Sequence, residues 1–338
     1  MPNPVFSDVH VQSALTQISV AYMQNNDNYV ADKIFPPVPV VHQADKYFIF
    51  RKGDFLRDQM KPRADATESA GGGFNIDQGS YSATVYGFHK DVGDQVRRNA
   101  DPAIDIDVVT TKFVTQTLLI GRDRSFMSKY VTTGVWSVDC VGTPGGTPGT
   151  TTPPLWSDDV NGDPFTDIAT GQTSILETTG FLPNKLLLGW AVFQALKKHP
   201  LVIDRIKYTN PAFAGTINEE LLAQAFDIEE VIVSKAVYNS AVESVTTSPV
   251  PGGTPSVGFV MSNSALLVYA APSASLMMPS AGYIFPWQGF SGLNNMGIRI
   301  MQIPMPWLGA NTVRLEGEMS YDMQVVGKDL GYFFSAIA

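Results

Sequence analysis

Cysteine, long apolar runs and targeting signals are scarce or missing in this chain of 338 residues. Cys140 is the one cysteine, which excludes an internal disulfide and a cysteine-rich zinc site. No apolar run approaches the roughly 18 residues that a membrane helix needs. The first residues, MPNPVFSDVHVQ, lack the basic flank and apolar stretch of a signal peptide. We therefore expect a protein that does not enter membranes and that is made and kept in a cytoplasm.

Motifs of catalysis and metal binding are also missing. Histidine occurs without metal-ligand spacing and away from any nucleophile motif, at His10, His42, His89 and His199. Residues 159–163 imitate the opening of a calcium loop, but Pro164 replaces the glycine and Thr170 replaces the bidentate glutamate, so a helix cap is favoured. The glycines of GTPGGTPG follow no strand and open no helix, unlike a phosphate-binding loop. The sequence predicts no catalytic, cofactor-binding or metal-binding residue.

The composition nevertheless predicts an ordered globular protein. Hydrophobic residues make up 44% of the chain and charged residues 16%, as in folded proteins. The net charge of −9 argues against the whole chain embracing nucleic-acid phosphate, although a local basic face is compatible with it. The balance of charge alone therefore names no partner.

The longest helical pattern runs from Asp101 to Tyr130. Its apolar side chains recur with a period near 3.6 residues, at Val109, Phe113, Val114, Leu118, Phe126, Met127 and Tyr130. Asp101 before Pro102 is a typical helix start, and Asp105 and Asp107 lie where the helix dipole favours negative charge. We predict one helix of roughly 40 Å, at about 1.5 Å per residue, with extended structure on both sides.

The residues before this helix are typical of arms rather than of a core. A short amphipathic helix is predicted within 8–24, where one face carries Val11, Leu15, Ile18 and Tyr22. The prolines of FPPVPV (35–40) then force an extended backbone. Because a terminal arm stays ordered only when a surface holds it, we expect a neighbouring chain to supply that surface.

Two strand-like segments, 46–63 and 80–90, flank a polar linker with three consecutive glycines and predict a long hairpin-like excursion. The first segment contains only two acidic residues, Asp54 and Asp58. Its basic residues are Lys46, Arg51, Lys52, Arg57, Lys61 and Arg63. One interpretation is a solvated ribbon, because exposed ion pairs contribute roughly 0–1 kcal/mol. The other is a loop that lies across an acidic surface of another copy and sets its register.

After the long helix the pattern becomes mixed. Residues 141–154 are a Gly/Thr/Pro loop, and Asp163 with Pro164 starts a helix. Residues 180–285 predict one compact α/β domain, with a buried strand at LPNKLLLGW, a helix broken at Pro200, and further strands. A loop (277–296) then precedes two long strands and the closing segment KDLGYFF, which we expect beside the long helix.

An acidic pair lies on the second of these long strands. Glu316 and Glu318 are two residues apart, so a strand places both carboxylates on one face. Acid and base catalysis needs two carboxylates in different environments that converge on a substrate, and no cleft is indicated here. The pair therefore favours an acidic stripe for a partner.

Four stretches carry a resemblance to a known family: DKYFIFRKGDFLRD, DIDVVTTKFVTQTLLIGRDRSFMSKYVTTGVW, PNKLLLGWAVFQALKKHPLVIDRIKYT and RLEGEMSYDMQVVGKDLGYFF. In this order they resemble the major capsid proteins of tailed bacteriophages, which have the HK97 fold. The resemblance implies an α+β fold with four parts. These are an N-arm (1–42), an E-loop hairpin (43–92), a P-domain (93–164 with its connecting loop, spine helix about 101–131, and return strands 291–338) and a mixed α/β A-domain (165–290).

The same resemblance implies a shell protein without enzymatic activity. Identical subunits would assemble into hexamers and pentamers of an icosahedral shell around double-stranded phage DNA, in the virion, after assembly in the host bacterial cytoplasm. Because the arm begins at Met1, a separate scaffolding protein is implied, with a portal and decoration proteins as further partners. The DNA would be contacted only non-specifically, and an acidic inner wall would keep it from sticking.

Two alternatives belong to other classes. A shell of the same fold could hold protein cargo, as encapsulin-like nanocompartments do. An enzyme or a carbohydrate-binding tail component is less favoured, because the arms and the long helix would then have no purpose.

Our hypothesis for the contact between subunits places the E-loop of one copy on the P-domain of the next. The local charge inversion motivates it, since a basic segment lies within an acidic chain. The residues predicted at this interface are Lys46, Arg51, Arg57, Lys61, Arg63, Glu68, Glu316, Glu318 and Asp322.

Overall fold

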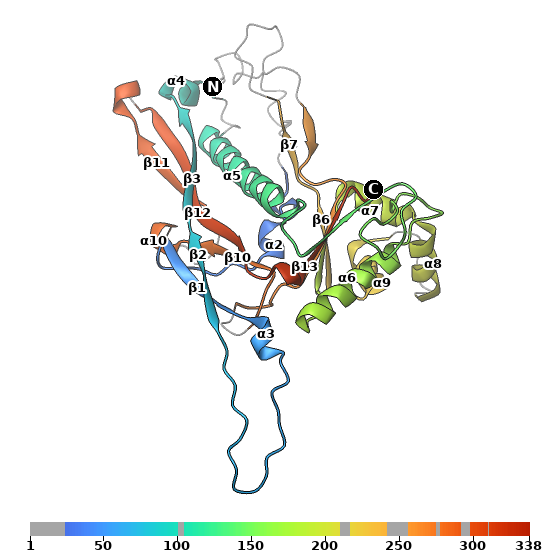
Figure 1. Ribbon diagram of the computed structural model, residues 1–338. Helices are drawn as coiled ribbons and strands as arrows, with labels where there is room; N and C mark the ends of the chain where they lie inside the picture. Colours follow the sequence, from blue (N-terminus) through green and yellow to red (C-terminus); the bar gives the residue numbers. More distant parts are fainter. Residues whose placement is uncertain are drawn as a thin grey trace.

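The computed structural model describes residues 24–100, 105–209, 217–241, 256–274, 278–291, 298–309 and 311–338. Within them the chain forms an elongated body with two sheets, one long helix and a loop that projects far from the body (Figure 1). No helix of the described residues is long and apolar enough to span a membrane.

The first sheet, called the outer sheet here, is organised around the long strand β12 (Val313–Val325). On one side β12 pairs antiparallel with β3 (Thr84–Val92). On the other side it pairs antiparallel first with β11 (Arg299–Pro304) and then with β10 (Gly282–Pro286). One strand therefore holds together segments from three distant parts of the sequence.

Helix α5 (Ile106–Tyr130) lies against one face of the outer sheet (Figure 1). Val114 and Leu118 are buried there, above Gly317 of β12. A Cβ atom at position 317 would lie 2.5 Å from Cγ1 of Val114 and 2.9 Å from Cδ1 of Leu118. The sheet approaches the helix this closely because position 317 carries no side chain.

The long helix is confirmed, but its start and its buried stripe differ from the prediction. Asp105 caps α5 and accepts hydrogen bonds from the backbone N–H groups of the next turn, whereas the predicted cap, Asp101 with Pro102, lies outside the described residues. Val109 and Phe113 were wrongly placed in the stripe, since they are 46% and 45% exposed. The stripe runs through Thr110 and Val114 instead, because the contact with β12 sets which face is buried.

The second sheet, called the central sheet here, is mixed and has five strands. Their order across the sheet is β4 (Val138–Val141), β13 (Gly331–Ser335), β9 (Ala265–Val268), β5 (Lys185–Gly189) and β6 (Glu230–Ser234). The pairs β4 with β13 and β5 with β6 are parallel, and the two other pairs are antiparallel. Strand β9 is buried along its whole length, so this sheet forms the main core.

Four helices lie beside the central sheet (Figure 1). They are α6 (Pro164–Thr179), α7 (Trp190–Lys198), α8 (Pro200–Thr209) and α9 (Glu219–Phe226). The predicted break at Pro200 is confirmed, because α7 ends two residues before it and α8 begins with it. The cap at Asp163 is confirmed as well, since its side chain accepts from the backbone N–H three residues along α6.

Shorter elements complete the described fold. The strands are β1 (Ala44–Phe50), β2 (Ile76–Ser82), β7 (Val237–Asn239) and β8 (Val257–Phe259). The helical turns are η1 (Asn26–Asn28), α2 (Ala31–Ile34), α3 (Lys52–Phe55), α4 (Asp94–Asn99), α10 (Gln288–Ser291), η2 (Pro306–Leu308) and η3 (Lys328–Leu330).

Two predictions near the end of the chain are wrong. The segment KDLGYFF was expected beside the long helix, but β13 lies inside the central sheet between β4 and β9. Its residues are almost all buried, which requires cover on both faces. The loop predicted at 277–296 contains β10, which is a fully buried strand. Its apolar run GYIFP was the sequence feature that could have predicted a strand here.

The described part of the N-terminal arm lies against its own chain, while the expected contact with a neighbouring chain stays a prediction. Residues 24–41, called the strap here, cross from β7 over α5 to the edge of β10. The backbone N–H groups of Val38 and Val40 donate to the carbonyls of Ile284 (2.7 Å) and Pro286 (2.9 Å). The amphipathic helix predicted within 8–24 lies outside the described residues except for residue 24.

An aromatic pocket explains why the strap stays on the body. Phe35 is completely buried, and its ring centroid lies 5.1 Å from that of Phe126, 5.3 Å from that of Tyr130 and 6.4 Å from that of Trp136. Burying a phenylalanine stabilises the docked strap by roughly 2–3 kcal/mol. The proline pattern predicted the extended backbone of the strap but not this surface.

Candidate interaction surface

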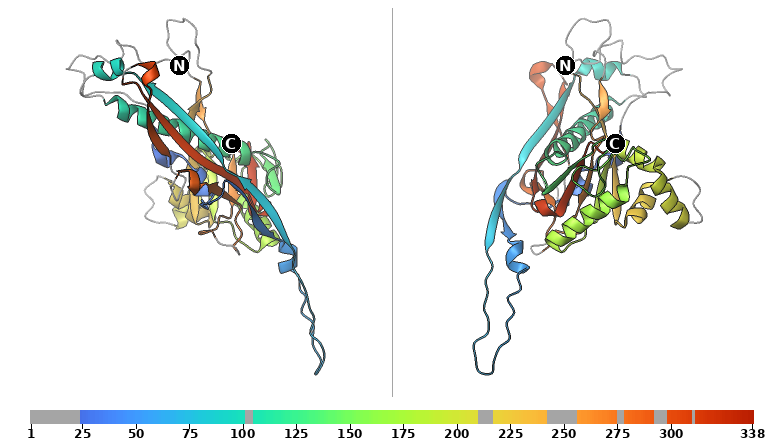
Figure 2. Two further views of the ribbon diagram at one scale, coloured as in Figure 1. Left: turned by 90° about the vertical axis from the view of Figure 1, so that its left-hand side faces the viewer. Right: turned by 45° about the vertical axis from the view of Figure 1, so that its right-hand side comes forward.

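The projecting loop (residues 51–75) extends from a two-stranded ribbon. Strands β1 and β2 pair antiparallel from Ala44 opposite Ser82 to Phe50 opposite Ile76. Beyond α3, residues 56–75 form no strand or helix and are almost all exposed, and the loop stands clear of the body in both further views (Figure 2). The excursion is therefore confirmed, although the predicted segment 80–90 lies mostly in β3, within the outer sheet.

Two of the predicted interface cations are already paired inside the loop. Nε of Arg51 lies 2.7 Å from Oδ2 of Asp77 across the ribbon, and this guanidinium holds the pKa of that carboxyl below its usual range. Arg57 lies 3.6 Å from Asp54, one turn away. Their positive charge is therefore partly compensated within one chain.

The remaining predicted charges of the ribbon and loop have no ionic partner among the described residues. Lys46 and Lys61 make no ion pair there, and Glu68 makes none either. Arg63 donates only to the backbone carbonyl of Thr67. Lys61 and Arg63 near the end of the loop thus make no ion pair among the described residues, and the same part of the loop also carries Asp58, Asp65 and Glu68.

The three predicted acceptors lie together on the face of the outer sheet that points away from α5. Alternation along β12 puts Glu316, Glu318 and Asp322 on this face, as the spacing predicted for the first two. Glu318 lies 2.6 Å from Arg299 of the neighbouring strand. Asp322 accepts from the backbone N–H of Ser82 at 2.9 Å, which fastens the ribbon to the sheet.

Glu316 is the acceptor that the chain leaves unused. It faces His89 of β3 in register, and its side-chain carboxylate makes neither an ion pair nor a hydrogen bond in the described part of the chain. Its neighbour Arg314 is bound to Asp91 instead, at 2.7 Å. No cation of the projecting loop touches these acceptors within one chain. The predicted basic residues and the predicted acidic residues therefore lie at separate places on the subunit.

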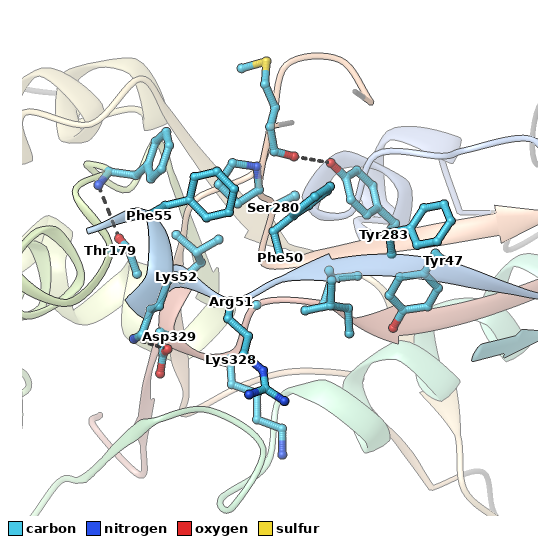
Figure 3. Close-up of a pocket in the computed structure, with 18 of the residues that line it drawn as sticks. Tyr47, Phe50, Arg51, Lys52, Phe55, Thr179, Ser280, Tyr283, Lys328 and Asp329 are labelled. Carbon is cyan, nitrogen blue, oxygen red and sulfur yellow. Dashed lines mark hydrogen bonds and ion pairs between the residues drawn. The ribbon is translucent and has the colours of Figure 1, made fainter. Parts of the chain in front are cut away.

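A groove that the sequence reasoning missed separates the base of the projecting loop from the body. Its volume is about 740 Å³, and β1 and α3 form one wall. The opposite wall comes from the body and is mostly apolar, with Phe181, Met278, Tyr283, Phe285 and Leu330. In Figure 3, Tyr47 and Tyr283 lie at one end, Phe55 and Lys52 with Asp329 at the other, and Phe50 between them. The aromatic run KYFIF in β1 was the sequence feature that could have indicated this groove.

A buried carboxylate fastens the strap to the long helix. Asp123 of α5 is completely buried, and its two oxygens accept from the backbone N–H groups of Val30 (2.9 Å) and Ala31 (3.1 Å) at the start of α2. Burial raises the pKa of Asp123 to about 6 despite these hydrogen bonds. Next to it, the buried Arg122 lies 3.3 Å from Asp32 of the strap. Sequence reasoning missed this site.

The segment that imitates a calcium loop forms a turn and a helix cap. The carboxylate of Asp158 accepts from the backbone N–H groups of Val160 (3.0 Å) and Asn161 (3.2 Å), and Asp163 caps α6. In the residues that the structure describes, no three His, Cys, Asp or Glu side chains are placed to hold a metal ion. The acidic side chains of this segment therefore stabilise the backbone.

Comparison by sequence gives one informative relative. No protein-family model matches the chain. The chain is 33% identical over 76 residues to the major capsid protein of Burkholderia phage BcepMu. This match covers 22% of the chain and 24% of that protein, so the chain spans about a quarter of the relative's length.

Comparison by structure covers nearly the whole chain. A phage-related protein from Bordetella bronchiseptica RB50 is similar with a TM-score of 0.65 and 20% identity, covering 93% of this chain and 94% of that one. The capsid of cyanophage P-SCSP1u is similar with a TM-score of 0.57 and 9% identity, covering 97% and 93%. The SrpI encapsulin of Synechococcus elongatus PCC 7942 is similar with a TM-score of 0.53 and 11% identity, covering 96% and 94%.

The sequence identities to these structures are between 9% and 20%, so the likenesses show the fold alone. The α+β architecture predicted from the order of segments agrees with them. The resemblance to tailed-bacteriophage major capsid proteins is therefore confirmed, and this chain has their HK97 capsid fold.

Proposed function

We propose that this chain is a major capsid protein, which assembles with identical copies into an icosahedral shell. The HK97 capsid fold over more than nine-tenths of the chain carries this proposal. The named sequence relative, a phage major capsid protein, supports it. The role is structural, and no catalytic step is part of it.

The finer proposal concerns the contents of the shell and the proteins that take part in its assembly. Hexamers and pentamers of the chain enclose double-stranded phage DNA in the virion, and assembly takes place in the host bacterial cytoplasm. A separate scaffolding protein, a portal and decoration proteins take part, while the DNA is contacted only non-specifically. The net charge of −9 supports the last point, because an acidic wall repels phosphate.

In this role the parts of the chain take the names used for capsid proteins. We assign residues 1–42 to the N-arm, 43–92 to the E-loop, 93–164 and 291–338 to the P-domain, and 165–290 to the A-domain. Three strands are exceptions, because β4 and β13 pair within the central sheet and β10 pairs with β12 in the outer sheet. The strap (24–41) lies in the N-arm and the projecting loop (51–75) in the E-loop.

The projecting loop supplies the contact between neighbours in this proposal. A shell gains strength when each subunit buries a large area that is spread over several neighbours. Lys61 and Arg63 rest on the outer sheet of the next subunit, with Glu316 as their main acceptor. Among the described residues Lys61 and Glu316 make no ion pair and Arg63 donates only to a backbone carbonyl, which supports this pairing. Complementary charge of this kind determines the choice of partner and the register of the contact more than it determines the binding affinity.

Electron microscopy of purified protein tests the proposed function. The chain is produced with the assembly proteins encoded beside it and purified by gradient sedimentation. We expect closed particles of uniform diameter with icosahedral symmetry. A protein that remains a folded monomer at high concentration in the presence of those assembly proteins would contradict the proposal.

The second candidate function is a compartment for protein cargo, which the likeness to an encapsulin supports. The contents of the particles distinguish the two candidates. Nuclease-resistant double-stranded DNA inside the particles fits the phage capsid, whereas a stoichiometric cargo enzyme in particles without DNA fits the compartment. The phage relative favours the capsid.

A further inference from the structure

The strap covers one edge of the outer sheet. Strand β10 pairs with β12 along one side only. The strap lies along the other side of β10 as a parallel segment, with bridges from Pro37 to Ile284 and from Val40 to Trp287. The outermost segment on this side of the sheet therefore comes from the beginning of the chain.

The backbone bonds between the strap and β10 come from alternate residues. The N–H groups of Val38 and Val40 donate to carbonyls of β10, and the carbonyl of Pro36 accepts from the N–H of Ile284 at 3.2 Å. Neighbouring residues of an extended strand direct their backbone groups to opposite sides, so a ladder uses every second residue. Every second residue of the strap, from Pro36 to Val40, therefore turns its backbone toward β10.

The two residues between them are both proline. Pro37 and Pro39 turn their backbone to the outside of the sheet, where the N–H of any other residue would be available to a further strand. Proline has no backbone N–H. No backbone group of the described residues outside β10 and its following turn bonds to residues 36–40. The outer side of the strap thus offers no N–H donor from residue 36 to residue 40.

The edge that the strap covers would favour association between chains if it were bare. Strand β10 has the apolar sequence GYIFP, and Ile284 and Phe285 are 0% and 5% exposed. A bare edge of this kind presents free backbone groups beside apolar side chains, which is the typical origin of edge-to-edge association. The buried Phe35 and the carboxylate of Asp123 hold the strap over this edge.

We propose that the strap seals the outer sheet against pairing with other chains. Val38 and Val40 satisfy the backbone groups of β10, and Pro37 and Pro39 leave the new outer edge without donors. Proline stops further pairing at the edge of a sheet because it cannot donate to the ladder. The inference concerns the single folded subunit in solution, so it does not depend on the proposed shell function.

Replacement of the prolines by valine tests the seal. Pro39→Val adds one outward N–H at an exposed position, and Pro37→Val supplies a second one. Both changes keep the bonds of Val38 and Val40 to β10. Pro36→Val is the matched control, because its new N–H would face β10. Circular dichroism and thermal unfolding should show that all these variants fold like the unmodified chain.

Sedimentation velocity measures the association, and electron microscopy separates closed particles from other large species. Association outside closed particles should rise at least about tenfold in the double variant Pro37→Val with Pro39→Val, because a second copy can then pair with the strap. The rise should be smaller in Pro39→Val and missing in Pro36→Val. A folded double variant that associates no more than the unmodified chain would overturn the inference, as would an equal rise in Pro36→Val.

Hydrogen exchange locates the contact. The backbone amide of residue 39 exists only in the valine variants, so its exchange rate reports directly on the outer side of the strap. We expect slow exchange of this amide in the associated species and fast exchange in the free subunit, measured by mass spectrometry with electron-transfer fragmentation. Fast exchange in both species would place the association at another surface and refute the seal.

Discussion

The carboxylate of Asp123, in the middle of the long helix, lies 2.9 Å from the backbone nitrogen of Val30 in the strap. Its second oxygen accepts from the next residue at 3.1 Å, so one side chain caps the short helix α2 and ties it to α5. A segment at the beginning of the chain is thereby fixed to a helix more than ninety residues further on.

The first prediction is that Asp123 makes the stability of the fold depend on pH. Its pKa is about 6 in the folded chain and near 3.8 when exposed, so the folded state binds the extra proton between these values. The stabilisation from this proton is complete below about pH 4 and is lost as the pH rises through 6. Urea unfolding at pH 5 and pH 7.5 should show a loss of about 1.4 kcal/mol that is missing in Asp123→Asn.

This comparison separates Asp123 from the other ionisable groups. Burial also raises the pKa of Asp167, and Arg122 and Asp32 face Asp123 across the strap, but all three remain in both proteins. The difference between the two pH profiles therefore reports Asp123. If stability depends on pH in the same way in both proteins, ionisation of the Asp123 carboxyl costs the folded chain no free energy.

The second prediction concerns the aromatic pocket under the strap. Phe35→Ala removes a completely buried ring and should lower the free energy of unfolding by about 3–5 kcal/mol. Phe74→Ala is the matched control, because Phe74 is more than half exposed in the projecting loop, and it should change stability by less than about 1 kcal/mol. Limited proteolysis should cut the strap faster in Phe35→Ala. Equal stability of the two variants would argue against a docked strap.

The third prediction uses one glycine of the outer sheet and one of the helix that packs on it, Gly317 of β12 and Gly121 of α5. Gly317→Ala puts a methyl group 2.5 Å from Cγ1 of Val114, so the helix and the sheet must separate, at a cost of about 1–3 kcal/mol. Gly121→Ala adds the same group on α5 where nothing lies within 4 Å. That change should stabilise the helix by about 0.5–1 kcal/mol. Thermal unfolding should therefore move the two midpoints in opposite directions.

The fourth prediction tests the contact of the projecting loop. Reversing Lys61 and Arg63 to glutamate should leave the subunit folded and block shell formation, because two like charges would then face the carboxylate of Glu316. Lys198→Glu with Lys207→Glu is the matched control, since both lysines are exposed on α7 and α8. Assembly is measured by gradient sedimentation and circular dichroism reports the fold.

A charge swap makes this test sharper. Adding Glu316→Lys to the double reversal should restore a substantial share of the particles, because the pair then has opposite signs again. Normal particles from Lys61→Glu with Arg63→Glu alone would exclude the proposed loop contact. Failure of the swap alone would place the acceptor at a residue other than Glu316.

The predictable part of this fold is the part set by local pattern. The period of α5, the cap at Asp163, the break at Pro200 and the alternation of β12 all depend on neighbours in sequence, and all agree with the structure. The strand β10 escaped prediction because its cover comes from β12 and the strap, both distant in sequence. The buried face of α5 was misjudged at Val109 for the same reason.

The candidate interface also has one part that the local sequence predicts and one part that only the structure supplies. The basic segment 46–63 and the acidic face of β12 were visible in the sequence. The pairing of Arg51 with Asp77, which spans the whole loop, and of Glu318 with Arg299 follows from strand register that only the structure supplies. The groove needs three separated segments to meet, so no local pattern indicates it.

Asp329 gives the base of the projecting loop a mechanical connection to the core. Its carboxylate binds Lys52 at the start of the loop and the hydroxyl of Ser137, the residue before β4, and the chain continues from it into β13. The ammonium of Lys52 accordingly lowers the pKa of this carboxyl. Tension that a neighbouring copy exerts on the loop would thus be delivered to two adjacent strands of the central sheet. Pulling the loop outward would therefore load the edge strand β4 together with the buried strand β13 beside it.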